Sequence, residues 1–377
     1  MFDFPFDRPS VVTALFALFS YLLLYRKGAD LFLKSKDIDL NGRFAFGTIF
    51  LFYVLISVHC INGDFFHLMD SVHNYDLTDP EQNSQEPVYT LIAKIWNRNY
   101  LLFRLTVWGI AVLCIQKIYQ SIGANFHLGF WMFLVCYAIL FAYARASSAM
   151  AIYFLGLVLL ISDLRSYFVR LLGIGLLFLS YEFHHSMLIL ILLTPLAFFP
   201  LNKFTFFTVL GALPFIVIIV RIVFSSVLDD ASILDDEALQ RKMDNYSVRE
   251  GRTDTLRTQI MDGIKYVSAY IPFIVSAFYV VVRGVMDFLK KAEKRLFIYT
   301  FWLFIVTTAV SYLDMEVNTF FYRMLYMTLI PSIVIFTVLV QNRIISKKIQ
   351  CRVLYIAMTS QILNYLYMLY LNILNKS

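Results

Sequence analysis

From residue 149 to residue 199 the chain reads AMAIYFLGLVLLISDLRSYFVRLLGIGLLFLSYEFHHSMLILILLTPLAFF, a stretch that is apolar almost throughout. If residues 166–199 formed one helix, it would be a rod of roughly 50 Å, because a helix rises about 1.5 Å per residue. Such a rod is too long for a single membrane crossing. Ionisable residues interrupt the stretch at 163–165 and again at 182–185. These interruptions predict three short helices, at residues 149–163, 166–181 and 186–199.

The composition of the whole chain places these helices in a membrane protein. The 377 residues are 60% hydrophobic and 15% charged, and the mean hydropathy is +0.69. Ordinary soluble domains are nearer half apolar and a quarter charged. The 37 phenylalanines and 24 tyrosines are too many for the core of a soluble protein of this length. We therefore predict an all-α, polytopic integral membrane protein in which residues 1–377 form a single transmembrane domain.

Further apolar runs near the length of a membrane-spanning helix occur along the rest of the chain. Together with the three short helices they predict about twelve transmembrane helices. The other runs lie at residues 10–25, 44–62, 100–118, 126–144, 204–224, 265–283, 296–313, 320–340 and 353–374. The first ten residues lack the basic start of a signal peptide, so we expect the first run to stay in the mature protein.

The positions of Lys and Arg orient these helices. Short cytoplasmic loops carry an excess of Lys and Arg, and the basic clusters at 26–43, 283–295 and 343–352 all fall on one side when the N-terminus is outside. Merging two of the three short helices would move the cluster at 283–295 to the outside. The formal charge of +6 therefore belongs to cytoplasmic loops and does not indicate nucleic-acid binding. Two long acidic loops, 64–99 and 225–264, are expected to face outward.

Ionisable residues at the outer ends of the helices are the candidate functional groups, because charges within or beside a membrane span are expensive. Arg145 is followed by small residues, Glu182 stands beside the pair His184 and His185, and Arg323 lies just inside a late span. An arginine fork matches phosphate oxygens bidentately. This set suggests group transfer on a lipid-linked diphosphate.

Each of these residues also has a purely structural interpretation. Arg145 could extend its charge to the membrane interface, as interfacial arginines do. Arg323 could pair with Asp314 or Glu316, and a histidine of the pair could simply hydrogen-bond the backbone.

Motifs of soluble enzymes do not occur in the chain. There is no Gly-rich phosphate loop, no HExxH and no GxSxG. The four cysteines show neither CxxC nor metal-ligand spacing, and Asp64, Asp70 and Asp76 lack a fixed ligand spacing. We therefore expect neither a cofactor nor a metal.

Six local patterns, in their order along the chain, resemble the bacterial EpsG-like and Wzy-type polysaccharide polymerases over roughly residues 50–335. The outer loops supply three of them and the helix ends the other three. The patterns are Gly63-Asp64-Phe65-Phe66, Glu86-Pro87-Val88-Tyr89-Thr90-Leu91-Ile92, Arg145 with the small residues after it, Phe183-His184-His185-Ser186-Met187-Leu188, Lys242-Met243-Asp244-Asn245-Tyr246 and Phe321-Tyr322-Arg323-Met324-Leu325-Tyr326.

The resemblance implies a membrane glycosyltransferase with a GT-C-like architecture in the bacterial cytoplasmic (inner) membrane, with its active site facing the exterior. Such enzymes transfer a growing glycan from undecaprenyl diphosphate to a hydroxyl of another lipid-linked repeat unit. The product is an O-antigen (lipopolysaccharide), capsule or exopolysaccharide chain. The implied partners are the lipid-linked donor and acceptor, the bilayer, and a chain-length regulator and flippase of the same pathway, without nucleic acid.

The resemblance also implies roles for single residues. His184 is the first candidate for the base that takes the proton of the acceptor hydroxyl, and Asp64 is the second. Arg145 and Arg323 are expected to bind the diphosphate. The other expected substrate contacts are His185, Glu86 and Tyr246.

Two other classes of membrane protein stay open. A flippase for lipid-linked oligosaccharides would also carry charges within the membrane, but usually with repeat symmetry or matched broken helices, which this sequence lacks. A membrane O-acyltransferase could use His184 to activate an acceptor hydroxyl. Its acyl donor would come from inside, opposite to the expected side of the histidines.

Overall fold

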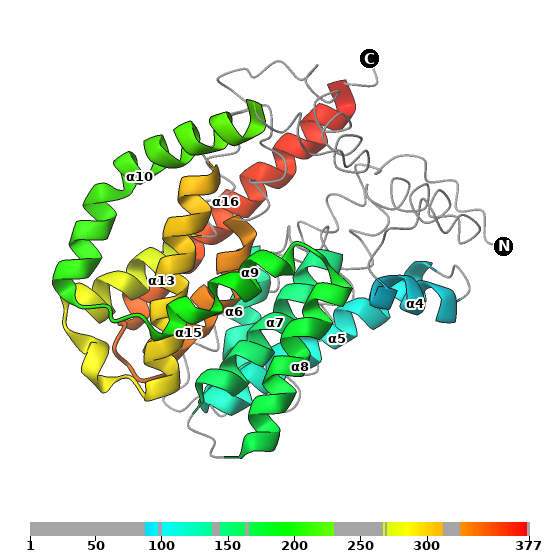
Figure 1. The fold of residues 1–377 in the computed structure, drawn as a ribbon, viewed down its shortest axis with the longest axis horizontal. Helices are drawn as coiled ribbons and strands as arrows, with labels where there is room; N and C mark the ends of the chain where they lie inside the picture. Colours follow the sequence, from blue (N-terminus) through cyan, green and yellow to red (C-terminus); the bar gives the residue numbers. More distant parts are fainter. Residues whose placement is uncertain are drawn as a thin grey trace.

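The computed structural model describes residues 87–96, 100–137, 144–162, 166–229, 267, 270–311 and 325–374, and within these ranges every regular element is helical (Figure 1). The α-helices are α4 (Pro87–Ile95), α5 (Tyr100–Ile122), α6 (Phe126–Tyr137), α7 (Ala144–Ile161), α8 (Tyr167–Phe183), α9 (Met187–Leu193), α10 (Lys203–Asp229), α13 (Lys291–Ser311), α15 (Leu329–Gln341) and α16 (Lys347–Leu374). Shorter helical pieces are η2 (Thr194–Phe198), the π-helical η5 (Phe278–Val282), η6 (Val285–Phe288) and η8 (Leu325–Thr328).

Each apolar run expected after residue 100 contains a helix within the described residues. In particular, the apolar stretch 149–199 divides into α7, α8, and α9 with η2, so the prediction of three short helices is confirmed. The helix α8 ends at Phe183 because the next residue, His184, has an extended backbone with φ −160° and ψ 115°. The runs at 10–25 and 44–62 lie outside the described residues, so the total of twelve stays a prediction.

The helix α7 lies at the centre of the fold between α5 and α8. Against α8 the two backbones nearly touch, since a Cβ added to Gly156 would lie 2.8 Å from the carbonyl oxygen of Gly173. A Cβ on Gly173 would in turn lie 3.0 Å from the carbonyl oxygen of Gly156. Small residues permit this close approach of helices. Against α5, the Ser148 hydroxyl donates to the carbonyl of Val107 at 2.9 Å.

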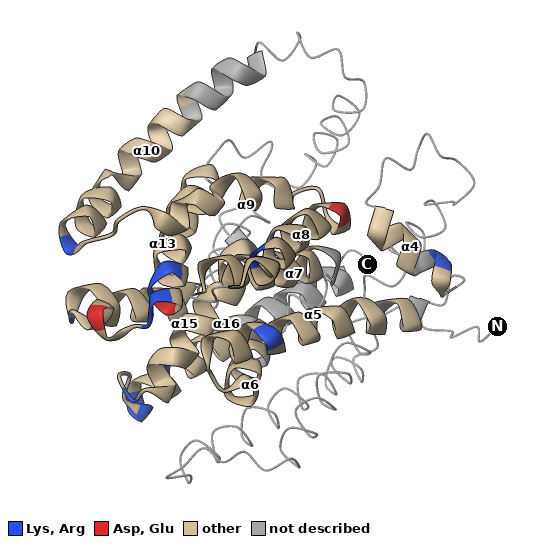
Figure 2. Cartoon of the chain, turned by 60° about the horizontal axis from the view of Figure 1, so that its bottom comes forward, with Lys and Arg blue, Asp and Glu red and all other residues tan. Residues whose placement is uncertain are grey.

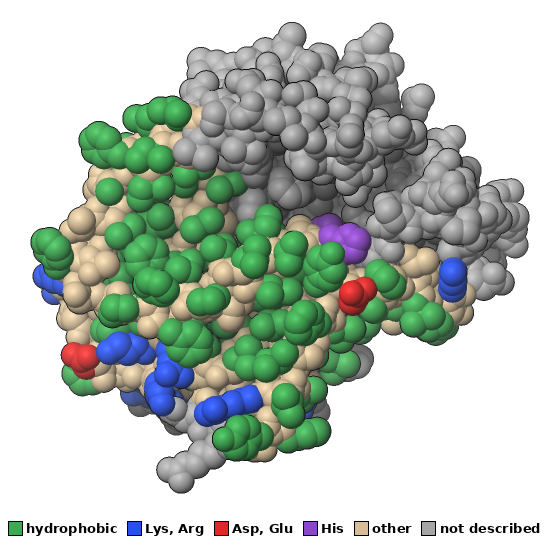
Figure 3. All heavy atoms as spheres, viewed as in Figure 1, with side chains coloured by type: hydrophobic (Ala, Val, Ile, Leu, Met, Phe, Trp, Pro, Cys, Tyr) green, Lys and Arg blue, Asp and Glu red, His purple; other side chains and the backbone are tan. Residues whose placement is uncertain are grey.

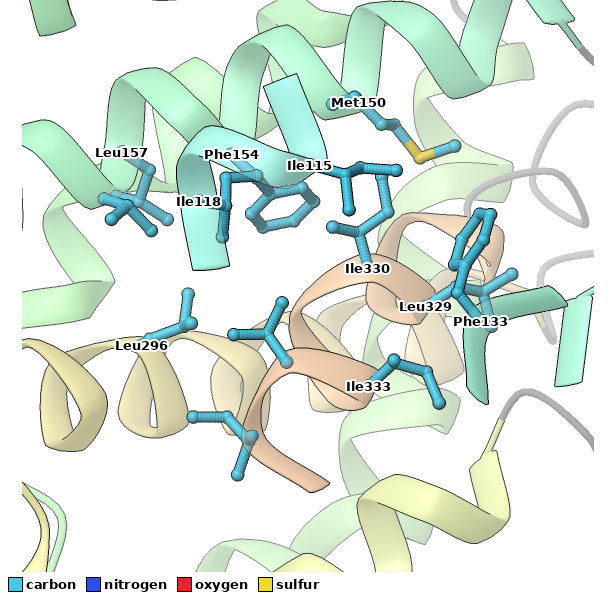
Figure 4. Packing of buried hydrophobic residues seen from close by; sticks show 14 of the residues in the cluster. Ile115, Ile118, Phe133, Met150, Phe154, Leu157, Leu296, Leu329, Ile330 and Ile333 are labelled. Carbon is cyan, nitrogen blue, oxygen red and sulfur yellow. The ribbon is translucent and has the colours of Figure 1, made fainter. Parts of the chain in front are cut away.

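Apolar side chains of α5, α6, α7, α13 and α15 meet in one buried cluster (Figure 4). Phe154 of α7 faces Ile115 and Ile118 of α5, and Ile330 of α15 lies between these layers and Phe133 of α6. Every residue of α15 from Leu329 to Val340 is buried. A helix that is apolar on all sides is expected only in such an interior position.

The outside of α8, α9 and α10 is also apolar (Figure 3). Tyr167 is 82% exposed, Phe204 79% and Leu192 70%. Large exposed apolar faces mark surfaces that contact a partner or a membrane. By length and hydropathy, the stretches Leu105–Ile122 and Lys203–Val220 qualify as membrane spans among the described residues. Shorter apolar helices are Ala146–Ile161, Met187–Phe198, Tyr270–Val282 and Leu329–Gln341.

Most Lys and Arg residues of the described helices gather at one end, which we call the cationic end (Figure 2). The Arg295 guanidinium donates to the carbonyl of Ile161 at 3.3 Å, which places the start of α13 beside the end of α7. The Gln341 side chain accepts from the N–H of Asn125 at 2.8 Å, which places the end of α15 beside the turn after α5. The cationic end holds Lys117, Arg170, Lys203, Arg283, Lys290, Lys291, Lys294, Arg295, Arg343, Lys347, Lys348 and Arg352.

This grouping agrees with the predicted sidedness for every basic loop that lies within the described residues. The opposite end is formed by α4, the starts of α5 and α7 and the end of α8. It includes Lys94 and the backbones of Arg104 and Arg145. Figure 3 shows a histidine far from the edge where Lys and Arg gather. Which end faces the cytoplasm stays a prediction.

Candidate functional site

The turn between α8 and α9 presents the histidine pair. The N–H of His184 still bonds the carbonyl of Ser180 at 2.9 Å, and the His184 carbonyl accepts from the N–H of Met187 at 2.9 Å. Phe183 and Met187 on either side are buried, whereas Glu182 and residues 184–186 are partly exposed. Two apolar anchors thus hold a short polar turn at the surface. The sequence signal for this turn was the break in the apolar stretch.

The two histidines have different surroundings. The ring of His185 stacks on the ring of Tyr181, one helical turn earlier, with centroids 4.8 Å apart and an angle of 28° between the planes. This stack fixes the direction of His185. His184 is the residue at which the backbone leaves the helix. The two histidines therefore occupy the same turn, but only His185 stacks on Tyr181.

The helix α4 packs against this turn. The ring of Tyr89 contacts Phe183 edge-on at 6.3 Å and Phe103 of α5 at 4.7 Å, measured between centroids. Within the predicted first outer loop, the residues after Glu86 thus form a helix over Pro87–Ile95. It begins with Pro87, a residue favoured in the first turn of a helix. The sequence motifs around Tyr89 and Phe183 are thus neighbours in space, which sequence reasoning did not predict.

The start of α7 lies at the same level. The contact of Gly156 with Gly173 sets the register of the antiparallel pair α7 and α8. Arg145 precedes Gly156 by eleven residues, and His184 follows Gly173 by the same number. Because both helices rise by the same distance per residue, the backbone of Arg145 and that of His184 reach the same depth. The fold therefore places α4, the Arg145 backbone and the histidine turn at one end of the molecule.

A buried group of hydroxyls, which we call the tyrosine clasp, fixes α9 below the turn. Pro195 lacks an N–H and the N–H of Thr194 bonds Ile191, so the carbonyl of Leu190 loses its regular helical partner. The hydroxyl of Tyr153 lies 2.7 Å from this carbonyl oxygen, and that of Tyr299 lies 3.3 Å from it.

The clasp links three helices. The Tyr153 hydroxyl is 2.8 Å from both the Thr194 hydroxyl and the Tyr299 hydroxyl, and both tyrosines are fully buried. It ties α9 to α7 and α13 at the Leu190 carbonyl. Sequence reasoning missed Tyr153 and Tyr299. The pair Thr194-Pro195, which predicts an open carbonyl, was the available signal.

The remaining predicted site residues are only partly covered. Asp64, Glu86, Tyr246 and Arg323 lie outside the described residues, and α7 is described at Arg145 in its backbone alone. In the part of the chain that the structure describes, no group of three or more His, Cys, Asp or Glu comes together as metal ligands.

The family model described as the EpsG family matches residues 47–376. This chain belongs to the EpsG family. The resemblance predicted from the short motifs is thereby confirmed, and the EpsG match extends beyond residue 335, through α15 and almost to the end of the chain. It includes α4, the start of α7 and the histidine turn. No curated protein and no solved structure matches the chain.

Proposed function

We propose that this EpsG-family chain is a membrane-embedded glycosyltransferase that joins oligosaccharide repeat units, carried on undecaprenyl diphosphate, into a surface polysaccharide. The family match supports polysaccharide biosynthesis as the process. The main structural support for the site is that α4, the Arg145 backbone and the histidine turn lie at the same end of the fold. The six resembling patterns include all three of these elements.

The membrane part of the proposal draws on two observations. The exposed apolar face of α8, α9 and α10 suits lipid tails, and the cationic end suits the cytoplasmic surface under the positive-inside rule. The histidine turn would then face the exterior. A lipid-linked donor would enter between helices with its diphosphate at the level of this turn.

The proposed reaction forms one glycosidic bond. The hydroxyl oxygen of the acceptor sugar attacks the anomeric carbon of the donor, and the bond from that carbon to the diphosphate oxygen breaks. Undecaprenyl diphosphate leaves, with Arg145 and Arg323 stabilising its negative charge through bidentate hydrogen bonds. His184 accepts the proton of the attacking hydroxyl, a contribution typically of about 10²–10⁴-fold in rate.

The neighbouring groups would bind the sugars. His185, held by its stack on Tyr181, is placed to contact the acceptor sugar beside the base. Glu86 directly precedes α4, whose Tyr89 rests on Phe183, so a role in binding at this turn fits its place in the chain. Asp64 is the alternative base, and Tyr246 is assigned to substrate from the second outer loop.

The glycan phenotype of cells without the protein tests the proposed function. Loss of a polymerase leaves single repeat units on the exported lipid. Loss of a flippase leaves no exported units, and loss of an O-acyltransferase leaves full-length chains without acyl groups. Mass spectrometry of the lipid-linked glycans separates these outcomes, and either of the last two would overturn the proposal.

A further inference from the structure

Part of the cationic end borders the apolar face directly, along the edge where Lys and Arg gather in Figure 3. We call this part the cationic rim. The first turns of α8 and α13 and the first residue of α10 contribute to it, and all of its residues are exposed or partly exposed. Its members are Arg170, Lys203, Lys291, Lys294 and Arg295.

Among the described residues, two carboxylates lie near the rim, those of Asp287 and Glu293. Asp287 lies 3.6 Å from the Lys294 ammonium, but it is 90% exposed and this pair is screened by water. Glu293 is buried, and its carboxylate accepts the backbone N–H of Lys290 at 2.8 Å, where it caps the start of α13. Among the described residues of this edge, positive charge is therefore in excess.

Exposed aromatic rings stand beside these cations. The guanidinium of Arg295 lies 4.9 Å from the centroid of the Phe198 ring, and it donates to the carbonyl of Ile161. A guanidinium has five N–H groups, so the Arg295 side chain is held in place with donors left for an anion. Tyr rings are enriched at the depth where lipid headgroups lie, and Tyr167 is exposed at the start of α8. The exposed rings here are Tyr167, Phe168, Phe198, Phe199, Phe204 and Phe288.

We infer that the cationic rim binds the phosphate headgroup of an anionic phospholipid whose acyl chains lie along α8 and α9. Leu171 and Leu192, both strongly exposed, line the path of these chains. The complementarity is twofold, because the rim offers fixed positive charge and the adjoining face offers apolar surface. Basic pockets between helices at the cytoplasmic side favour such headgroups. The inference rests on the proposed membrane embedding, but it does not depend on polymerase activity.

Native mass spectrometry of the full chain, released from nanodiscs of mixed phosphatidylcholine and phosphatidylglycerol, measures the lipids that stay bound. The wild-type chain should retain more phosphatidylglycerol than phosphatidylcholine. The double variant Lys291→Gln/Lys294→Gln should lower the retained ratio of anionic to zwitterionic lipid by about tenfold. The matched control Lys347→Gln/Lys348→Gln, which removes the same charge from α16, should keep it. Asp287→Asn, which releases Lys294 from its carboxylate, should raise the ratio.

An unchanged ratio in the rim variant, or an equal loss in the control, would overturn the inference. If the rim variant does not fold, a photoreactive phosphatidylglycerol with its reactive group at the head should label the wild-type chain near residues 166–172 and 288–296. Label found elsewhere would count against the rim. Recovery of the chain from cells without detergent would instead refute the membrane embedding.

Discussion

The ring of Tyr89 rests edge-on against the ring of Phe183, with their centroids 6.3 Å apart, although 93 residues separate them in the chain. One residue belongs to the helix after Glu86 and the other directly precedes His184. The contact therefore joins two sequence patterns of the EpsG family into one surface. A substitution at this contact can also separate the two patterns without changing a proposed catalytic residue.

Replacing Tyr89 by Ala should detach α4 from the end of α8. A buried aromatic residue truncated to Ala typically costs about 3–5 kcal/mol, and we expect the loss to be local to α4. Polymer should fall by about an order of magnitude, as small displacements of a positioning element cost catalysis heavily. Gel analysis of the glycan, at matched protein level, measures it. Tyr167→Ala, an exposed tyrosine at the cationic end, serves as the control, and normal polymer from Tyr89→Ala would refute the role of the contact.

His184→Gln should slow elongation by about a hundredfold or more in purified protein supplied with lipid-linked repeat units, because Gln hydrogen-bonds but takes no proton near neutral pH. Substrate binding should persist. His127→Gln, a histidine of α6 near the cationic end, should elongate normally. Near-normal elongation by His184→Gln together with an inactive Asp64→Asn would move the base to the first outer loop.

Arg145→Lys and Arg323→Lys should each reduce polymer by an order of magnitude or more at unchanged protein level, because a lysine cannot reproduce the bidentate fork. Arg170→Lys at the cationic rim provides the comparison, since it keeps the charge at a site remote from the reaction. Full-length glycan from both Arg145→Lys and Arg323→Lys would exclude the proposed diphosphate site.

Single cysteines in a cysteine-free background test the sidedness. Cysteine at Ser84 and Ser247, in the two outer loops, should react with a membrane-impermeant maleimide in intact cells. Cysteine at Ser346, exposed at the cationic end, should react only after permeabilisation. The reverse pattern would invert the orientation and place the histidine turn in the cytoplasm.

The tyrosine clasp should contribute measurable stability. Tyr153→Phe and Tyr299→Phe each remove one donor from the Leu190 carbonyl, and each should cost about 0.5–1.5 kcal/mol. The double variant should cost more than the sum, because the carbonyl then keeps only the Thr194 hydroxyl, 3.1 Å away. Thermal unfolding in detergent measures the difference. A purely additive result would show that the two hydroxyls act independently.

Local sequence patterns were sufficient to predict much of this structure. The break before His184 could be predicted because ionisable residues interrupt an apolar run. The contact between Gly156 and Gly173 could not, since a glycine in an apolar helix does not indicate which helix it meets. Tyr153 and Tyr299 are 146 residues apart, and each alone is indistinguishable from an ordinary core or interfacial tyrosine.

In the candidate site, too, some features could be predicted from local sequence and others could not. His184, His185 and Arg145 are recognisable in the sequence as ionisable residues inside apolar stretches, and the fold brings their backbones to one level. The neighbour relation of Tyr89 and Phe183 depends on how α4 folds back across α5. That depends on tertiary packing, to which a single sequence gives no direct signal.

The short connection between Phe183 and Leu190 fixes a length as well as a shape. One residue inserted there would rotate α9 by about 100° relative to α8, since a helical turn holds 3.6 residues. The Leu190 carbonyl would then point away from Tyr153 and Tyr299. A substitution at position 185 therefore leaves this carbonyl in place, whereas a change in the spacing from 184 to 190 does not. We therefore expect that insertions and deletions at this turn are not tolerated.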